Sequence, residues 1–196
     1  MSKLTREDLY SLEEYSKLRP EYRAKVMEHK KSRQLHLGDH VTLYFEDRFT
    51  MQYQIQEMLR AERIFESEGI QEELDAYNPL IPDGKNWKAT MMVEYSDIEE
   101  RKQALSKLIG IEDKTYVRVE GFNKVYPIAD EDLERDTEEK TSAVHFLRFE
   151  LTPEMVNAVK SGAALSAGVE HEHYSVEVAP VRQDIRDSLA ADLEMH

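Results

Sequence analysis

The longest uninterrupted helical pattern in the sequence is residues 47–78, DRFTMQYQIQEMLRAERIFESEGIQEELDAYN. Successive residues of an α-helix are rotated by about 100° around its axis, so within an arc of about 80° this pattern contains Met51, Ile55, Met58, Glu62 and Phe65. This apolar stripe predicts one long central helix, which Asp47 caps and Gly69 ends or bends. Because an unpaired buried carboxylate is costly, Glu62 should be paired, protonated, at a wet cleft or less buried than the stripe indicates.

Composition restricts the classes of partner. The 196 residues suffice for one domain with a good core, and 40% hydrophobic with 34% charged residues is typical of a soluble globular protein. The net charge of −14 repels phosphates and anionic lipid headgroups, so we expect no nucleic-acid and no membrane partner. The best basic patch, residues 23–33, is more typical of a helix C-terminus than of a nucleic-acid site.

Cysteine is absent, which excludes disulfides, thiolate catalysis, thiolate zinc sites and cysteine-ligated iron–sulfur clusters. The N-terminus, MSKLTREDLY, has no apolar run suited to a signal peptide, and no segment approaches the length of a membrane span. We therefore expect a cytoplasmic protein.

The rest of the chain predicts helices and strands on both sides of this helix. Two N-terminal helices should meet at Arg19–Pro20, and Gly38–Asp39 should form a two-residue hairpin turn. Strands are expected at residues 88–95, 115–120, 124–128, 143–151, 165–169 and 174–178, with short helices after 96 and 153. This order predicts an α+β fold: a largely antiparallel sheet of about five strands covered by helices, with a helical N-terminal segment. Residues 4–174 should form a single domain, with residues 175–196 as a peripheral strand and helix.

The central helix carries the first candidate polar site. In a structural interpretation, the helix is laced with ion pairs and an arginine neutralises Glu62, with Arg148 of the strand AVHFLRFEL as the best candidate. In a functional interpretation, Glu62 and Glu66 face a ligand together with His145, Arg148 or Tyr77. Both interpretations remain open at this stage.

Two histidine pairs are candidate metal ligands. His36 and His40 would approach each other at the base of the predicted hairpin, and His171 and His173 would share one face of a strand. Both patterns also arise by chance on acidic surfaces. The chain has no GxSxG, GxGxxG or Walker A sequence, and its long helix has no Glu-x-x-His pair for a di-iron site.

The loop at residues 78–87, NPLIPDGKNW, contains two prolines and a glycine. Long loops with aromatic residues either cap the core or carry function. In the functional interpretation this loop binds a protein partner through Asn78, Asp83, Lys85 and Trp87.

Three segments carry a family resemblance: TLYFEDRFTMQYQIQEMLRAERI, EELDAYNPLIPDGKNWKATMM and EEKTSAVHFLRFEL. They resemble the bacterial family known as domain of unknown function 3501, over Leu4 to Tyr174. The resemblance implies no particular activity. Its members are often encoded beside a rubrerythrin-like protein and an iron–sulfur oxidoreductase, which implies an accessory role in a redox or peroxide-response system.

Two hypotheses about function follow. The first is a cytosolic accessory protein that binds such a redox partner through its acidic surface, the 78–87 loop and the central helix. The second is a metal- or small-ligand-binding enzyme that uses the carboxylate, histidine and arginine site around the central helix, with a metal as its conceivable cofactor.

Overall fold

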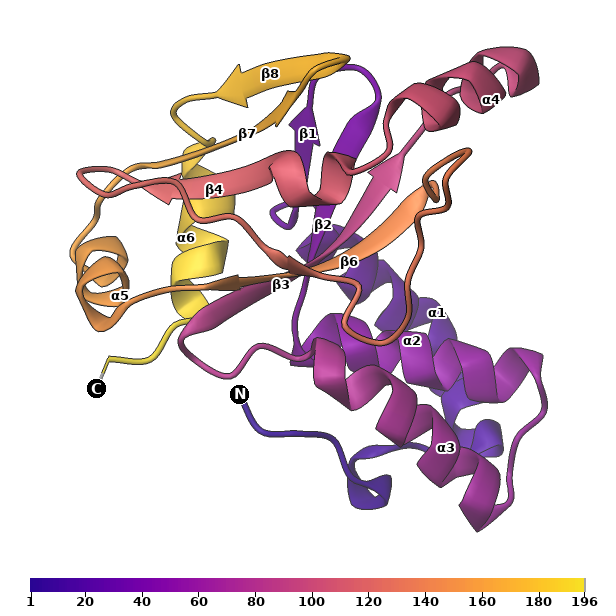
Figure 1. Ribbon diagram of the computed structural model, residues 1–196. Helices are drawn as coiled ribbons and strands as arrows, with labels where there is room; N and C mark the ends of the chain where they lie inside the picture. Colours follow the sequence, from indigo (N-terminus) through magenta and orange to yellow (C-terminus); the bar gives the residue numbers. More distant parts are fainter. Residues whose placement is uncertain (196) are drawn as a thin grey trace.

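The computed structural model describes residues 1–195, which form two antiparallel sheets and six α-helices (Figure 1). Sheet A has the order β1 (Gln34–Leu37), β2 (Val41–Glu46), β3 (Asn86–Val93), β6 (Val144–Glu150) and β5 (Ile128–Ala129). Sheet B contains β4 (Thr115–Val119), β7 (Leu165–His171) and β8 (Tyr174–Val178). The helices are α1 (Leu12–Lys30), α2 (Arg48–Ala61), α3 (Ser67–Tyr77), α4 (Ile98–Lys107), α5 (Pro153–Lys160) and α6 (Gln183–Ala191). The predicted α+β fold with antiparallel strands is confirmed.

The single long central helix is not confirmed, because the stretch forms α2 and α3 with a reversal between them (Figure 1). Arg63 adopts a left-handed φ of 53°. The amide of Arg63 donates to Arg60 O at 3.3 Å and the amide of Ile64 donates to Leu59 O at 2.9 Å. This is the hydrogen-bond pattern of a Schellman helix end, which glycine usually supplies. Gly69, predicted to end or bend the helix, lies inside α3.

The predicted break at Pro20 is also wrong, because α1 continues through it for 19 residues. Proline removes one hydrogen bond from a helix interior. Burial on both sides of Pro20 offsets that loss, since Tyr15 and Val26 are fully buried. Arg19 adds two hydrogen bonds to Glu57 of α2, from Nε at 3.0 Å and from Nη2 at 2.8 Å.

Smaller differences concern the turns. The turn from β1 to β2 has three residues, because Leu37 pairs with Val41. The predicted hairpin of residues 115–128 is reduced to one bridge between Val117 and Val125, and β5 pairs with β6 instead. The acidic segment after β5 is an ordered loop without a helix.

The main core lies on one face of sheet A. Alternate residues of β2, β3 and β6 pack there against sheet B, and the C-terminal residues Val181, Ile185, Leu189 and Leu193 join the same cluster. The Trp87 indole donates to Leu189 O at 2.9 Å. The segment expected to be a peripheral tail thus supplies buried core residues. No helix within residues 1–195 is long and apolar enough to cross a membrane.

Candidate ligand-binding cleft

The opposite face of sheet A lies beneath α2 and α3 and is only partly filled. Side chains alternate across a strand, so this face presents Tyr44 and Glu46 of β2, Thr90 and Met92 of β3, and Val144 and Phe146 of β6. Thr50, Met51 and Gln54 of α2 close the space from above, with Tyr77 and Leu80 beside them. The resulting cleft has a volume of about 440 Å³ and a predominantly apolar lining.

A second cavity of about 740 Å³ adjoins this cleft. The two share Tyr77, Leu80 and Phe146, so they lie side by side over the same sheet. The second cavity adds Lys88 and Arg148. Together the two spaces are large enough for a small organic ligand, and ligand pockets are commonly apolar with a few polar groups.

Glu46 is the distinctive polar group on the floor of the cleft. One carboxyl oxygen accepts a hydrogen bond from Thr50 Oγ1 at 2.6 Å and the other accepts one from Thr90 Oγ1 at 3.1 Å. Lys88 is opposite Glu46 in the strand register, but its Nζ donates to Pro79 O. Within residues 1–195 the Glu46 carboxyl therefore has two hydroxyl partners and no ion pair to lysine or arginine.

Burial raises the pKa of the Glu46 carboxyl above its usual value. The hydrogen bonds from Thr50 and Thr90, and the more distant charges of Lys30 and Arg33, offset only part of that effect. Burial likewise lowers the pKa of Lys88 in the adjoining cavity. A carboxyl group in such a cleft accepts hydrogen bonds when ionised, and can also donate one or act as a general acid when protonated.

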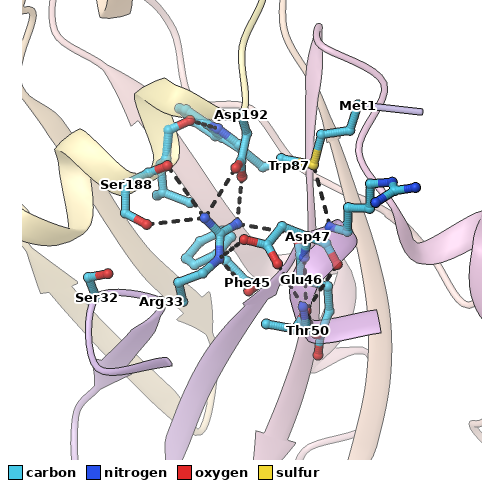
Figure 2. Close-up of polar contacts among 12 residues, drawn as sticks. Met1, Ser32, Arg33, Phe45, Glu46, Asp47, Thr50, Trp87, Ser188 and Asp192 are labelled. Atoms are coloured by element: carbon cyan, nitrogen blue, oxygen red, sulfur yellow. Dashed lines mark hydrogen bonds and ion pairs between the residues drawn. The ribbon is translucent and has the colours of Figure 1, made fainter. Parts of the chain in front are cut away.

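Arg33 fixes the end of β2 that carries Glu46 (Figure 2). Its guanidinium is 2% exposed and donates to the backbone oxygens of Phe45 at 2.9 Å and Glu46 at 3.2 Å. It also pairs with both carboxylate oxygens of Asp192, at 3.1 and 2.5 Å, and with the Ser188 hydroxyl at 3.1 Å. These contacts leave Arg33 no free face for a ligand, so its role is to hold the strand end in place.

Asp47 follows Glu46 and caps α2. Its Oδ1 accepts from the Thr50 amide at 2.8 Å, and its Oδ2 lies 2.6 Å from His29 Nε2 and 3.5 Å from Arg33 Nε. The predicted helix cap at Asp47 is therefore present. The same cap orients Thr50, whose hydroxyl donates to Glu46.

The five residues of the predicted polar site are divided among three places. Glu62 and Glu66 are exposed at the turn between α2 and α3, and Arg148 pairs with Glu131 and Glu150 rather than with Glu62. Tyr77 and Arg148 do line the cavity described above. His145 is fully buried on the core face of β6, away from the cleft.

The histidine pairs lie on the surface and hold other partners. His36 Nδ1 lies 3.0 Å from the Thr42 hydroxyl, and His40 Nδ1 lies 2.9 Å from Glu94 O while its ring stacks on Tyr95. The rings of His171 and His173 are 5.8 Å apart between centroids, and His171 Nε2 lies 2.8 Å from Ile109 O. Among residues 1–195, neither pair has a third side chain close enough to share a metal ion.

The residues predicted to bind a partner have mixed positions. Trp87 is fully buried and cannot contact another protein, whereas Asp83 and Lys85 are exposed. Asn78 exchanges two hydrogen bonds with the backbone of Leu4, at 2.8 and 2.9 Å. The loop therefore caps the core, which is the structural alternative for this segment.

Glu46, Thr90 and Arg33 were not among the site residues predicted from the sequence. The alternation in VTLYFE already placed Tyr44 and Glu46 on one face of a strand, opposite Val41, Leu43 and Phe45. The alternation did not show that α2 covers this face, because that depends on how the elements pack.

The comparisons with known proteins agree with the resemblance noted above. The family described as "Protein of unknown function (DUF3501)" matches residues 3–193. The chain belongs to this family. The family match extends past Tyr174, where the resemblance was expected to end. It includes the C-terminal segment in which Asp192 is buried.

A crystal structure of a family-like protein supports the fold. It is described as a novel protein of unknown function from Burkholderia pseudomallei K96243 and is 53% identical to this chain. The similarity covers 98% of this chain and 100% of that one, with a TM-score of 0.93. No curated protein matches the chain, so membership in the family brings no activity with it.

Proposed function

We propose that the protein binds a small organic ligand in the cleft between sheet A and helices α2 and α3, with Glu46 as its principal polar contact. The observation that carries this proposal is a mainly apolar cleft of about 440 Å³ with a carboxyl group on its floor that forms no ion pair within the described residues. Glu46 is half-buried, and a carboxyl group there without an ion pair is costly to keep for stability alone. A ligand that hydrogen-bonds to it offsets that cost.

The lining indicates the chemical class of the ligand. Met51, Met92, Leu80 and Phe146 offer apolar contacts to a ring-sized body. Glu46 favours a hydroxyl or amine donor and disfavours a ligand carboxylate, because two carboxylates repel each other. We therefore propose a phenol-like or amine-bearing aromatic molecule rather than an organic acid.

Three probes of similar size distinguish these classes: phenol, benzylamine and benzoate. In an amide NMR titration at pH 7.5, phenol and benzylamine should shift the resonances of Thr50, Thr90 and Phe146, and benzoate should bind more weakly. Glu46→Gln should weaken benzylamine binding by about tenfold, since a hydrogen bond to a charged group contributes about 1.5 kcal/mol or more.

The matched control is Glu21→Gln on the exposed face of α1, away from the cleft. It should leave the affinities for all three probes unchanged. Preferential binding of benzoate, or equal affinities in wild type and Glu46→Gln, would contradict the proposal.

A second proposal retains the accessory role that the resemblance implies, and it rests on the turn between α2 and α3. Phe65 is 73% exposed there. The exposed carboxylates of Glu62, Glu66 and Glu68 are close to it in the chain and outnumber the exposed Arg60 and Arg63. An aromatic side chain within acidic surroundings favours a basic partner surface, and a redox partner of the rubrerythrin-like or iron–sulfur type would need such a patch.

This second proposal is tested with purified candidate partners at low salt. Phe65→Ala should reduce binding, whereas Glu21→Gln should not. A failure to bind any rubrerythrin-like or iron–sulfur protein encoded beside this chain would remove its support.

A further inference from the structure

Lys88 is a basic group that the ligand site proposed at Glu46 does not use. It is half-buried on β3, and it lines the second cavity of about 740 Å³ together with Tyr77, Leu80 and Phe146. Its Nζ donates a hydrogen bond to the backbone oxygen of Pro79. Among residues 1–195 no carboxylate lies within ion-pair distance of this nitrogen, so the amine at the cavity wall has only a neutral partner.

The register of sheet A places Lys88 between two charged residues on the same face. Glu46 of β2 and Arg148 of β6 are its cross-strand neighbours, and the Cβ atoms of such pairs are about 4.5–5.5 Å apart. The Glu46 carboxyl accepts from two threonine hydroxyls. Arg148 pairs with Glu131 at 2.7 Å and with Glu150 at 2.6 Å. The neighbouring carboxyl groups therefore bind other side chains and leave Lys88 without a counter-charge.

A second ammonium group binds the same short segment, residues 78–81. Lys3 Nζ donates to Asn78 O at 2.6 Å and to Ile81 O at 3.3 Å, on either side of the Pro79 oxygen that Lys88 uses. Burial lowers the pKa of Lys3 as well. Of the two lysines, Lys88 is the one that lines the cavity.

The surroundings of Lys88 favour its neutral amine. Burial lowers its pKa, and the cations of Lys3 and Arg148 lower it further. The carboxylates of Asp83 and Glu131 act in the opposite direction without reversing the shift. Desolvation and neighbouring cations are the two means by which a lysine amine becomes nucleophilic near neutral pH.

We propose that Lys88 is a nucleophilic amine that forms an imine with a small neutral aldehyde held in the second cavity. Its Nζ attacks the carbonyl carbon and forms a C–N bond. The carbonyl oxygen then leaves as water with the two hydrogens of the neutral amine, and a C=N bond remains. The reaction needs no oxidant, reductant or other co-reactant. This activity goes beyond ligand binding at Glu46.

The lining of the cavity indicates the class of aldehyde. Tyr77, Leu80 and Phe146 offer apolar contacts to an aromatic ring. Three carboxylates also line the cavity: Asp75, Glu131 and Asp132. Because Arg148 is already paired, no free cation of the described lining balances the charge of an anionic aldehyde. A neutral aromatic aldehyde therefore suits the site better than one that carries a carboxylate.

The test is reductive trapping with benzaldehyde and sodium cyanoborohydride at pH 7. Reduction converts the imine into a stable secondary amine, and peptide mass spectrometry should find one benzyl group per chain, at Lys88. Lys88→Arg retains the positive charge without a nucleophilic amine and should lose this label. The matched control is Lys85→Arg, which changes an exposed lysine of the preceding loop and should keep the label at Lys88.

The pH and the charge of the probe give two further measurements. Labelling of Lys88 should exceed that of Lys85 by at least about tenfold at pH 7, and this preference should shrink toward pH 10, where ordinary lysines also lose their proton. Lys3→Gln removes a neighbouring cation, so it should slow labelling of Lys88 at pH 7 and leave it unchanged at pH 10. Relative to Lys85, 4-carboxybenzaldehyde should label Lys88 less than benzaldehyde does.

The inference is overturned if the label is spread over the exposed lysines without preference, if Lys3 carries it instead, or if Lys88→Arg still takes up one benzyl group per chain. Benzylamine has no carbonyl group, so its binding tests the Glu46 site alone. Benzylamine binding without labelling of Lys88 would leave the ligand site in place and remove the nucleophile.

Discussion

Two neighbouring carboxylates at the end of β2 have opposite environments. Asp47 is buried, yet the hydrogen bond from His29 and the charge of Arg33 outweigh that burial and lower its pKa. Within residues 1–195 the side-chain partners of Glu46 are the hydroxyls of Thr50 and Thr90, and burial raises its pKa. At Asp47 the cationic partners outweigh burial, whereas the hydroxyl partners of Glu46 do not.

The same contrast separates the two sides of this strand end. The Arg33 side is closed, with Asp192, Ser188 and two backbone oxygens around one guanidinium (Figure 2). The Glu46 side opens into the cleft. We infer that the closed side stabilises the fold and the open side binds the ligand.

The largest expected effect is on the closed side. Arg33→Met leaves Asp192 buried without its cation and leaves Asp47 with His29 alone, so it should reduce the free energy of unfolding by about 3–5 kcal/mol. Urea denaturation followed by circular dichroism measures this loss. A loss below about 1 kcal/mol would show that the cluster contributes little to the fold.

An intermediate effect is expected at Glu57, a second carboxylate with a cationic partner. Arg19 hydrogen-bonds to it and lowers its pKa to about 2, with help from the Tyr15 hydroxyl. Glu57→Gln should reduce the free energy of unfolding by about 1–2 kcal/mol at pH 7. A carboxyl group with a lowered pKa in the folded protein stabilises the fold above its unfolded pKa of 4.5, and this contribution disappears below the folded pKa. The stability difference between wild type and Glu57→Gln should therefore shrink as the pH falls from about 5 to about 2.

Denaturation of wild type and Glu57→Gln at several pH values checks both the size and the trend. Glu13→Gln, an exposed carboxylate in the same helix pair, is the control and should change stability by less than about 0.5 kcal/mol. A deficit in Glu57→Gln that is independent of pH would mean that the ion pair is not its cause.

The smallest effect on stability is expected at Glu46, and its pH trend should be reversed. A raised folded pKa stabilises the folded protein below the unfolded value, and this contribution is lost as the pH rises through the folded pKa. Glu46→Gln should therefore remain within about 1 kcal/mol of wild type and become relatively more stable between pH 5 and pH 8. Denaturation of wild type and Glu46→Gln at these two pH values measures the difference. If the variant instead becomes less stable relative to wild type as the pH rises, Glu46 behaves like Glu57 and Asp47, whose partners lower their pKa.

Periodicity in the sequence was sufficient for most of the strands and helices, although the predicted strand at residues 124–128 is reduced to one bridge. It failed where one residue had an unusual conformation: Arg63 takes the left-handed position that glycine normally occupies, so the end of α2 was invisible. It also failed at Pro20, where burial of Tyr15 and Val26 maintains the helix. Local propensity cannot show such tertiary effects.

The candidate site was harder to predict than the fold. Tyr77 and Arg148 were identified and do line one cavity, but Glu62 was placed in an apolar stripe that ends before it. Arg33 and Asp192 are 159 positions apart, and no local pattern joins them. The roof over Glu46 likewise depends on how α2 and α3 pack on sheet A.

The most direct test is a carboxyl-detected NMR titration of ¹³C-labelled protein, with and without benzylamine, in which Glu46→Gln assigns the Glu46 signal. The account predicts that Glu46 titrates above the ordinary value of 4.5 and that benzylamine changes its titration, while Glu57 titrates below 4.5 and does not respond. A Glu46 signal that titrates at or below 4.5 and is unchanged by benzylamine would contradict a ligand site built on this carboxyl group.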